Sequence, residues 1–539
     1  MTHLFIFNNA SRAANYGVGT YVRQLAEGFR GCPDWEVSFV DLFSDVGEYT
    51  IGEDEHGCRH YRVPASSSNM ESETYCRCAF YFLARHIPCD GGGRMVFLFN
   101  YFHHFPLATL LKGRYFDARV VFVVHFLNWC FRLKGNLSRF RQLTAPGYQP
   151  QDDEERQVLA DVETEKRALR LADEVIVLAG ATRRFLAEDY GISADKLHLV
   201  YNGWGDGPCP VPDSRPGAPR VVLFVGRLDE IKGPGYLIGA FRQVAGKHPD
   251  ARLVVAGDGD FQSALSQCRD LQGRVSFLGK VASKELEAVY SSAYIGVMPS
   301  FHEQCSYTAI EMMRHGIPLV GTDSTGLAEM LDATPELRVH IDEDDLKDDE
   351  FTTRMAACMD LLLSDADVRR RASQAVTELY EARYKAADMI RGTEAVVEAS
   401  FRRPGYTLSP DFLKPLDYRM MELVNQSPDI DLDFYGMGGI GVYLWKRATD
   451  LWDDAEETAH TSLLWEYLIY YMDWLQEAAG SECLPDEVLA MLHDMKRRHF
   501  YPLAAEALLA RRAGGDVPRR LPSDRDIMQN TLKICNCKI

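Results

Sequence analysis

The chain has 539 residues, of which 46% are hydrophobic and 25% charged, so it is long enough for two or three globular domains. Its formal net charge of -19, with no cluster of basic residues, argues against nonspecific binding of nucleic acid. No apolar run reaches the length of a membrane span, and Met1–Asn9 predicts a first strand rather than a signal peptide. We therefore expect a cytoplasmic protein.

The thirteen cysteines are scattered and form no paired Cys-x2-Cys motifs of the kind that bind metal. We expect their thiols to be reduced, as in cytoplasmic proteins, and we expect no bound metal. Redox or metal chemistry stays open only for the close pair Cys535 and Cys537.

The first part of the chain, residues 1–204, alternates short apolar runs with helical patterns, which predicts parallel β-α-β units of an α/β domain. The expected strands are Leu4–Phe7, Glu36–Val40, Met95–Phe99, Arg119–Val124, Glu174–Leu178 and Leu197–Val200. Parallel strands end at one edge of their sheet, and open α/β folds bind ligands there. Residues that directly follow these strands are therefore candidates for a site.

Two glycines, Gly17 and Gly19, lie in a long loop expected after the first strand and before a helix. Glycines at such a place let the backbone approach a phosphate at the helix N-terminus. A dinucleotide site with Asp41 as the ribose acid is the competing interpretation. It is disfavoured because Val22 occupies the position of the third glycine and the loop is too long for a tight turn.

Histidines follow two of the expected strands: His103 and His104 follow the third, and His125 follows the fourth. A histidine at a strand end either makes structural hydrogen bonds or lines a ligand site. Asn202 follows the last strand of the domain, and a linker rich in proline and glycine, residues 205–218, then leads to a second domain.

The second domain, residues 219–384, opens with a strand that runs into Gly226 and Arg227, with Lys232 at the start of a helix. An arginine and a lysine placed there can stabilise negative charge that gathers on a departing diphosphate. The alternative is that both are surface cations. Further strands are expected at Ala251–Ala256 and Val275–Leu278, the second of them ahead of Gly279.

A polar turn follows the apolar strand at residues 293–300 and precedes a helix that ends at Gly316. Glu303 lies at the start of this turn, and Glu311 lies eight positions later in the first turns of the helix. Both can face the carboxyl edge of the sheet. The alternative is that they are solvated or salt-bridged acids at a helix end.

The stretch from Glu303 to Glu311, with Gly316-Ile-Pro-Leu-Val320 and Gly326-Leu-Ala-Glu329 after it, resembles the E-x7-E signature of the retaining glycosyltransferases of family 4, also called glycosyl transferases group 1. The resemblance covers about residues 1–402. It implies the GT-B fold, in which two Rossmann-like domains face a central cleft, and a crossover helix at 385–402. It also implies transfer of a sugar with retention from a nucleoside-diphosphate sugar, with a UDP-sugar favoured, to an acceptor glycan, peptide or small molecule. The family needs no metal.

The same resemblance assigns residue roles. Arg227 and Lys232 would contact the diphosphate, Glu303 and His125 the transferred sugar, and Glu311 the ribose. The residues implied in donor binding are Gly17, Gly19, Gly226, Gly279, Ser306, Tyr307, Thr308 and Glu311. Contacts with the acceptor are expected from His103, His104 and Asn202.

One departure from the family pattern is the stretch Gln304-Cys305-Ser306-Tyr307, which stands where the family usually has Pro-Phe-Gly-Leu. It keeps open a sugar-nucleotide-binding scaffold without catalysis as an alternative function, and a dinucleotide oxidoreductase is a third. Residues 403–539 are expected to be a helical extension of unknown role. Gly439-Ile-Gly441 in it resembles a repeat of lanthionine-cyclase-like toroids, and an aromatic helix at 463–475 is either buried or a groove for a peptide or protein partner.

Overall fold

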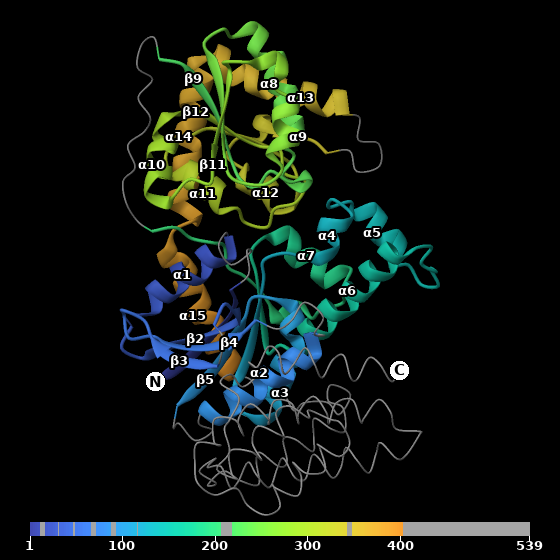
Figure 1. Ribbon diagram of the computed structural model, residues 1–539, viewed down its shortest axis with the longest axis vertical. Coiled ribbons are helices and arrows are strands. Elements are labelled where there is room, and N and C mark those ends of the chain that lie inside the picture. The colour runs from blue at the N-terminus through green and yellow to red at the C-terminus, as the bar shows by residue number, and fades with distance from the viewer. Residues whose placement is uncertain are drawn as a thin grey trace, which may run out of the picture. The chain divides into compact units, whose positions relative to one another are not determined.

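The computed structural model describes residues 1–10, 17–30, 32–46, 49–65, 72–87, 93–115, 117–205, 218–341 and 348–402. Most of the expected linker and the extension from residue 403 lie outside these residues, as do the predictions made for Cys535 and Cys537 and for the helix at 463–475. The described chain divides into two compact units, and we describe each by itself (Figure 1). The first comprises residues 1–14 and 33–120, and the second comprises 15–32 and 121–403.

The first unit is built around β1 (Thr2–Asn9), which pairs in parallel with β2 (Trp35–Ser44) on one side and β5 (Arg94–Phe99) on the other. Residues 4–7 of β1 are fully buried, as the apolar run predicted. Two short strands, β3 (Thr50–Glu53) and β4 (Arg59–Pro64), extend the sheet beyond β2. The sequence analysis missed both strands; β3 is an exposed edge strand, with no apolar face to give a signal.

The second unit contains three parallel strands of the first sheet and the whole of a second sheet. The strands of the first sheet are β6 (Arg119–Val124), β7 (Glu174–Val177) and β8 (Leu197–Leu199). The helices that accompany them are α1 (Gly17–Arg30), α4 (Asn128–Arg132), α5 (Leu137–Leu143), α6 (Asp153–Leu171), α7 (Gly180–Glu188) and α15 (Ala386–Arg402). Gly17 and Gly19 therefore lie in the first turn of α1, whereas the sequence analysis placed them in the loop before it.

The second sheet has six parallel strands in the order β11-β10-β9-β12-β13-β14. Their bounds are β9 (Arg220–Val225), β10 (Ala251–Ala256), β11 (Val275–Gly279), β12 (Ala293–Met298), β13 (Leu319–Thr322) and β14 (Arg338–Val339). The order of the strands reverses between the neighbours β9 and β12. In open α/β sheets the crevice at such a switch point, outside the carboxyl ends of the strands, is where ligands bind.

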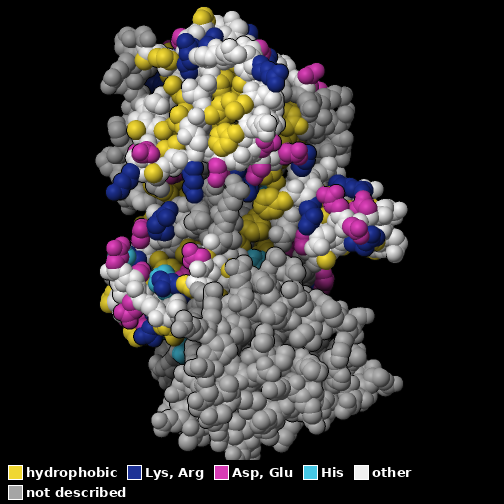
Figure 2. All heavy atoms as spheres, viewed as in Figure 1, with side chains coloured by type: hydrophobic (Ala, Val, Ile, Leu, Met, Phe, Trp, Pro, Cys, Tyr) yellow, Lys and Arg dark blue, Asp and Glu magenta, His cyan; other side chains and the backbone are white. Residues whose placement is uncertain are grey.

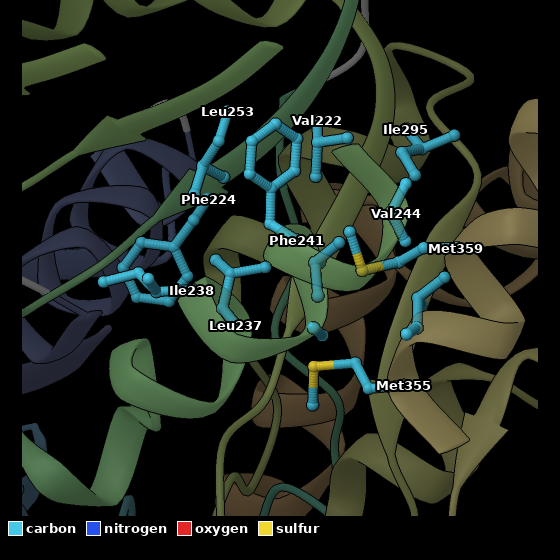
Figure 3. Packing of buried hydrophobic residues seen from close by; sticks show 14 of the residues in the cluster. Val222, Phe224, Leu237, Ile238, Phe241, Val244, Leu253, Ile295, Met355 and Met359 are labelled. Carbon is cyan, nitrogen blue, oxygen red and sulfur yellow. The ribbon is translucent and has the colours of Figure 1, made fainter. Parts of the chain in front are cut away.

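Helices cover this sheet, which is why its central strands are apolar throughout. They are α8 (Pro234–Lys247), α9 (Phe261–Ser266), α10 (Ser283–Ser292), α11 (Tyr307–Arg314), α12 (Thr325–Met330), α13 (Asp348–Ser364) and α14 (Ala366–Arg383). Figure 3 shows Val222 and Phe224 of β9 packed with Phe241 of α8 and Met355 and Met359 of α13. Each such side chain contributes about 1.5–3 kcal/mol by leaving water.

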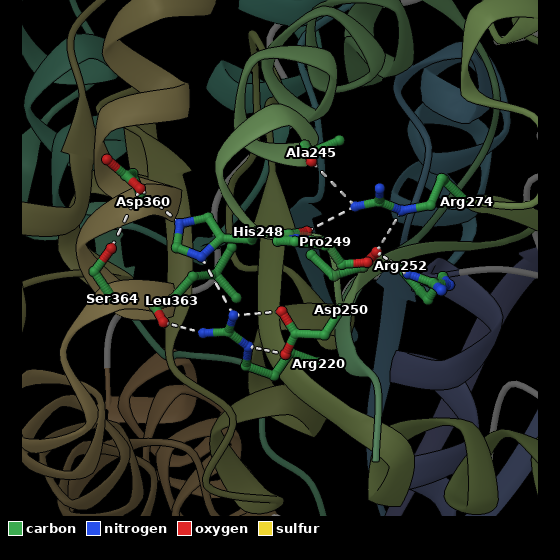
Figure 4. A network of polar contacts seen from close by, with 11 residues as sticks. Arg220, Ala245, His248, Pro249, Asp250, Arg252, Arg274, Asp360, Leu363 and Ser364 are labelled. Carbon is green, nitrogen blue, oxygen red and sulfur yellow. Dashed lines mark hydrogen bonds and ion pairs between the residues drawn. The ribbon is translucent and has the colours of Figure 1, made fainter. Parts of the chain in front are cut away.

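The amino end of the same sheet is closed by charged groups (Figure 4). Arg220, at the start of β9, donates to Asp250 at 2.6 Å, and His248 pairs with Asp360 of α13 at 2.7 Å. Hydrogen bonds from Arg220 hold the pKa of Asp250 below its usual value. The network ties α13 to the strand ends, so the amino end of the sheet is occupied by structural contacts.

A buried carboxyl group fixes the segment that follows β6. Glu165 of α6 is fully buried; its Oε1 accepts from the backbone N–H of Asn128 at 2.6 Å and its Oε2 from the hydroxyl of Tyr190 at 2.5 Å. Burial raises the pKa of Glu165 to about 8. Since Asn128 begins α4 three residues after His125, this carboxyl group positions the loop that carries His125.

We expect Glu165→Gln to change how stability depends on pH. The folded protein keeps the Glu165 proton up to about pH 8, whereas the unfolded chain loses it near its ordinary pKa of about 4.3. The unfolded state therefore binds fewer protons over this range, and the wild type loses stability as pH rises, by roughly 3 kcal/mol between pH 5 and 8. The variant lacks this loss, and urea unfolding across that range measures it.

The matched control is Glu163→Gln, an exposed glutamate on the same helix, whose unfolding free energy should follow the wild type at every pH. Parallel curves for wild type and Glu165→Gln would contradict the assigned proton on Glu165.

Candidate functional site

Backbone groups line the carboxyl ends of β9, β10 and β11. The N–H of Gly226 donates to Ala256 O at 2.9 Å, and the N–H of Gly257 donates to Gly279 O at 2.8 Å. Gly226 and Gly279, predicted separately, thus lie on either side of the turn after β10, at one edge of the sheet. Nothing lies within 4 Å of where a Cβ of Gly279 would be, so the backbone there is open to close approach by a ligand, whereas the missing side chain of Gly257 makes room for the carbonyl oxygen of Gly226.

Arg227 follows this row of glycines directly. The next residue, Leu228, is bonded through its N–H to Asp258 O at 2.7 Å, which holds the Arg227 turn beside the turn after β10. The guanidinium of Arg227 pairs with Asp229 at 2.9 Å, and both side chains are more than a third exposed. A pair so open to solvent contributes little to stability, so the guanidinium can exchange partners at low cost.

Lys232 and Glu303 form an ion pair across the switch point of the second sheet, with 2.5 Å between Nζ and Oε1. Lys232 ends the short 3-10 helix η4 (Glu230–Lys232), and Glu303 lies in the turn after β12. A backbone hydrogen bond from Phe301 N to Ile231 O, at 2.8 Å, sets the two segments in register. The carboxylate is only 10% exposed, so the lysine supplies the countercharge that compensates for its removal from water.

Glu311 lies on α11, one helical turn beyond its start. Its Oε2 accepts from the hydroxyl of Tyr290 at 2.9 Å, and burial raises its pKa to about 7. Ser306 is the N-cap of α11 and accepts from Ala309 N at 3.4 Å. Tyr307 is buried against Trp204, so its ring is used in packing, while Thr308 is half-buried.

His125 lies against α1. Its ring meets that of Tyr21 edge-on, with 4.7 Å between centroids, and burial lowers the pKa of His125 to about 3. The imidazole is therefore neutral at pH 7. Tyr21 is four residues after Gly17 and two after Gly19 in α1, so the structure brings His125 and the glycine-containing start of α1 to one part of the second unit.

The segment after His125 also reaches the turn that carries Glu303. Lys134 pairs with Glu230 of η4 at 2.8 Å. Gly135 has φ of 77°, and a Cβ there would lie 2.6 Å from the carbonyl oxygen of Phe301. Only glycine allows this approach, and it places the α4–α5 connection beside Glu303 and Lys232.

Of the three residues expected to contact the sugar acceptor, His103 and His104 lie in the first unit and Asn202 lies in the second. In the first unit, His103 lies 3.3 Å from Asn9 Nδ2, and its ring centroid is 4.2 Å from that of His104. Burial lowers the pKa of both histidines, to about 4 for His103. His104 is fully buried, so its ring has no surface to offer an acceptor. Asn202 is also buried, and its Nδ2 donates to Cys305 O at 2.6 Å, so it anchors the Glu303 turn.

Sequence reasoning missed Thr182, His302, Gln304 and Glu329 as residues that build the site. Gln304 was seen only as a departure from a pattern, yet it bonds to Thr182. Glu329 accepts from the first N–H groups of α7, at 2.9 Å from Gly180 and 2.6 Å from Ala181. No local signal could have found these pairs, because their members lie 122 to 149 positions apart in the chain.

The surface of the protein and a search of the described residues for metal sites and membrane spans add three observations. Figure 2 shows acidic and basic side chains interspersed on the face in view rather than gathered by charge. Within the residues that the structure describes, we find no group of three His, Cys, Asp or Glu side chains that could hold a metal ion. In that same part of the chain, no helix has the length and apolar character to cross a membrane.

Comparison with known proteins gives two matches to family models. The model described as glycosyl transferases group 1 matches residues 219–360, and the glycosyl transferase 4-like domain matches residues 16–203. Together they cover more than half of the chain.

Individual proteins of similar sequence agree with these family models. An uncharacterized glycosyltransferase of Methanocaldococcus jannaschii is 31% identical over 177 residues, which are 29% of this chain and 44% of that protein. Mannosylfructose-phosphate synthase of Agrobacterium fabrum is 33% identical over 178 residues, 29% of this chain and 39% of that one. The match thus spans less than half the length of either relative.

Solved structures show the same fold at low sequence identity. Sucrose-phosphate synthase from Thermosynechococcus elongatus superposes with a TM-score of 0.59 at 22% identity, covering 75% of this chain and all of that one. Anabaena HepE, solved in complex with UDP, gives a TM-score of 0.54 at 14% identity, with 74% and 100% covered. The two parallel α/β domains predicted from sequence are confirmed as a GT-B fold, and the chain belongs to the glycosyl transferases of group 1.

Proposed function

We propose that the protein transfers a sugar from a nucleoside-diphosphate sugar to an acceptor hydroxyl group, with retention of anomeric configuration. The observation that carries the proposal is the ion pair of Lys232 and Glu303 at the switch point between β9 and β12. A ligand with both a diphosphate and a sugar suits a site that offers a cation and a carboxylate side by side. The UDP complex of the structurally similar Anabaena protein favours a UDP-sugar as donor.

The cations and the glycine row suit the diphosphate. When the bond to the sugar breaks, negative charge grows on the departing diphosphate, and fixed cations there lower the barrier. Arg227 can leave its exposed partner Asp229 and bind phosphate oxygens in a bidentate manner. Lys232 has three N–H donors, so it can contact a phosphate while it keeps Glu303. These protein cations supply the positive charge that a metal ion provides in other transferases.

The carboxylates and the histidine suit the sugar and the ribose. Glu303, held by Lys232, can accept hydrogen bonds from sugar hydroxyls, and Glu311 can accept those of the ribose. His125 is neutral because it is buried. A neutral imidazole can hydrogen-bond a sugar hydroxyl without placing a positive charge beside the cationic sugar of the transition state. Retention is proposed from the family signature.

The competing hypotheses are weaker. A sugar-nucleotide-binding scaffold without catalysis is not favoured, because the named relatives include a synthase that acts as an enzyme. A dinucleotide oxidoreductase is not favoured, because both matched domains are those of glycosyl transferases. The acceptor is proposed to be a glycan, a peptide or a small molecule with a hydroxyl group, and the cytoplasm is the proposed location.

We expect Arg227→Ala and Lys232→Met each to lower the rate of sugar transfer by about 10²–10³-fold, because each removes a charge aimed at the leaving group. The measurement uses a panel of labelled sugar nucleotides and detects transfer or donor hydrolysis. Proton NMR of the first-formed product reports its anomeric configuration, which retention requires to match that of the donor.

The matched control is Arg252→Ala, an arginine of β10 whose guanidinium bonds to the carbonyl of Pro249 at the amino end of the sheet. It should transfer sugar at the wild-type rate. Full activity of both Arg227→Ala and Lys232→Met would contradict the assignment of these two residues to the diphosphate site.

We expect affinity for the donor to rise with pH around neutrality. The pKa of Glu311 is raised to about 7, so the carboxyl group is largely protonated at pH 6 and ionised at pH 8. Two ribose hydroxyls donate best to the ionised form, so binding favours loss of the proton. Calorimetry should show up to about tenfold tighter binding at pH 8 than at pH 6.

The titrant should be an intact sugar nucleotide, since free UDP has a terminal phosphate that itself titrates near pH 6. Glu311→Gln should show no such rise, whereas Glu285→Gln, an exposed neighbour on α10, should keep it. An unchanged pH profile in Glu311→Gln would show that Glu311 does not bind the ribose.

A further inference from the structure

The turn that carries Glu303 is bound on its inner side by a chain of buried polar side chains. Thr182 of α7 donates its hydroxyl to Gln304 Oε1. Gln304 Nε2 lies 3.4 Å from His302 Nε2, and His302 Nδ1 lies 3.0 Å from Thr325 Oγ1 of α12. Thr182, His302 and Gln304 are all less than a tenth exposed. We call Thr182, Gln304, His302 and Thr325 the Gln304 chain.

The chemistry of the groups in the Gln304 chain determines which one donates and which one accepts in each hydrogen bond. An amide nitrogen can only donate, so His302 Nε2 must accept, and the ring proton must be on Nδ1 and donated to Thr325. This requires a neutral imidazole, and burial does lower the pKa of His302 to about 4. Each of the three hydrogen bonds along the chain therefore joins one donor to one acceptor, as a low-dielectric interior demands of polar groups.

Further contacts bind the backbone of the same turn. Gly326 N donates to Glu303 O at 2.8 Å, and Asn202 Nδ2 donates to Cys305 O at 2.6 Å. A side chain at Gly326 would overlap the carbonyl oxygen of Gln304. α7 and α12 pack against each other, and Glu329 of α12 accepts the first N–H groups of α7. The residues on both sides of the Glu303 side chain are thus fixed by α7, α12 and the end of β8.

This arrangement explains the choice of glutamine. A carboxamide is the side chain of this length that can accept from Thr182 and donate to His302 at once. Proline, which is usual in the family at this place, can do neither. Glutamate would bury a second carboxylate next to Glu303, and like charges so close are unfavourable. The departure from the family pattern is thus a specific buried contact.

We propose that Gln304 is a positioning residue that holds Glu303 in register with the sugar of the donor by linking its turn to Thr182 of α7. The inference rests on the proposed function, in which Glu303 contacts the sugar. Gln304 itself touches no substrate. Its effect on the reaction comes through the carboxylate next to it, which must be placed to within a fraction of an ångström for catalysis.

The first experiment separates turnover from binding. We expect Thr182→Val and Gln304→Leu each to lower kcat by about 10²-fold, because a misplacement of about 1 Å costs that much. The Kd for UDP should stay within about threefold of wild type, since the proposed diphosphate contacts from Arg227 and the glycines do not involve this chain. Thr182→Ser keeps the hydroxyl and should restore kcat. Thr109→Val is the matched control, because this buried threonine donates its hydroxyl to Phe105 O within its own helix, α3 (Phe105–Arg114).

The second experiment needs no activity. Thr182→Val, Gln304→Leu and the double variant form a thermodynamic cycle in urea unfolding. We expect the double variant to be more stable than additivity predicts, by about 5–30-fold in the unfolding constant. Additive effects would show that the two side chains are not linked, and the proposal would fall.

The two experiments together distinguish the possible failures. A wild-type protein that transfers no sugar from any donor would overturn the proposed function and with it the positioning role, while the cycle would still report on the Gln304 chain. Wild-type transfer with an unchanged kcat in Thr182→Val would leave the proposed function intact and overturn the positioning role alone. A loss of kcat in Thr182→Val that Thr182→Ser restores supports both.

Discussion

The ion pair of Lys232 and Glu303 is the contact on which the site depends. Either charge alone would be costly in a place so little exposed, and the pair is favourable only because a backbone hydrogen bond from Phe301 to Ile231 sets its geometry. That hydrogen bond joins the segments after β9 and β12, the two strands between which the order of the second sheet reverses. The order of the strands thus creates the crevice, and the ion pair places a cation and a carboxylate in it.

The two ends of the second sheet are used differently. At the amino end, Arg220 binds Asp250 and the carbonyl oxygen of Leu363, and His248 binds Asp360, so α13 is tied to the strands. At the carboxyl end the strands run into glycines and into Arg227, whose partner is exposed. The amino end of the sheet therefore holds interactions that stabilise the fold, and the carboxyl end holds polar groups that can exchange partners. This division is typical of folds whose ligands bind at the carboxyl ends of parallel strands.

Burial shifts the pKa of several titratable groups around the site toward the neutral form. Burial lowers the pKa of His125 and His302, and it raises the pKa of Glu165 and Glu311. The neutral histidines act as directional hydrogen-bonding groups, and in Glu165 burial outweighs the hydrogen bonds from Asn128 and Tyr190, which favour the charged form. The ion pairs at the site are those of Arg227 with Asp229 and of Lys232 with Glu303, where the proposed diphosphate sugar would bind.

The sequence by itself determined the α/β class, the principal strands and the spacing of Glu303 and Glu311, because these follow from local periodicity and from residues close together in the chain. It also indicated that Arg227 and Lys232 lie near a strand end. Only the tertiary structure decided that Gly17 begins a helix, that Asn202 anchors the Glu303 turn and that Gln304 meets Thr182. These outcomes depend on which distant segments pack together, and a bond between residues 122 positions apart leaves no trace in the pattern around either of them.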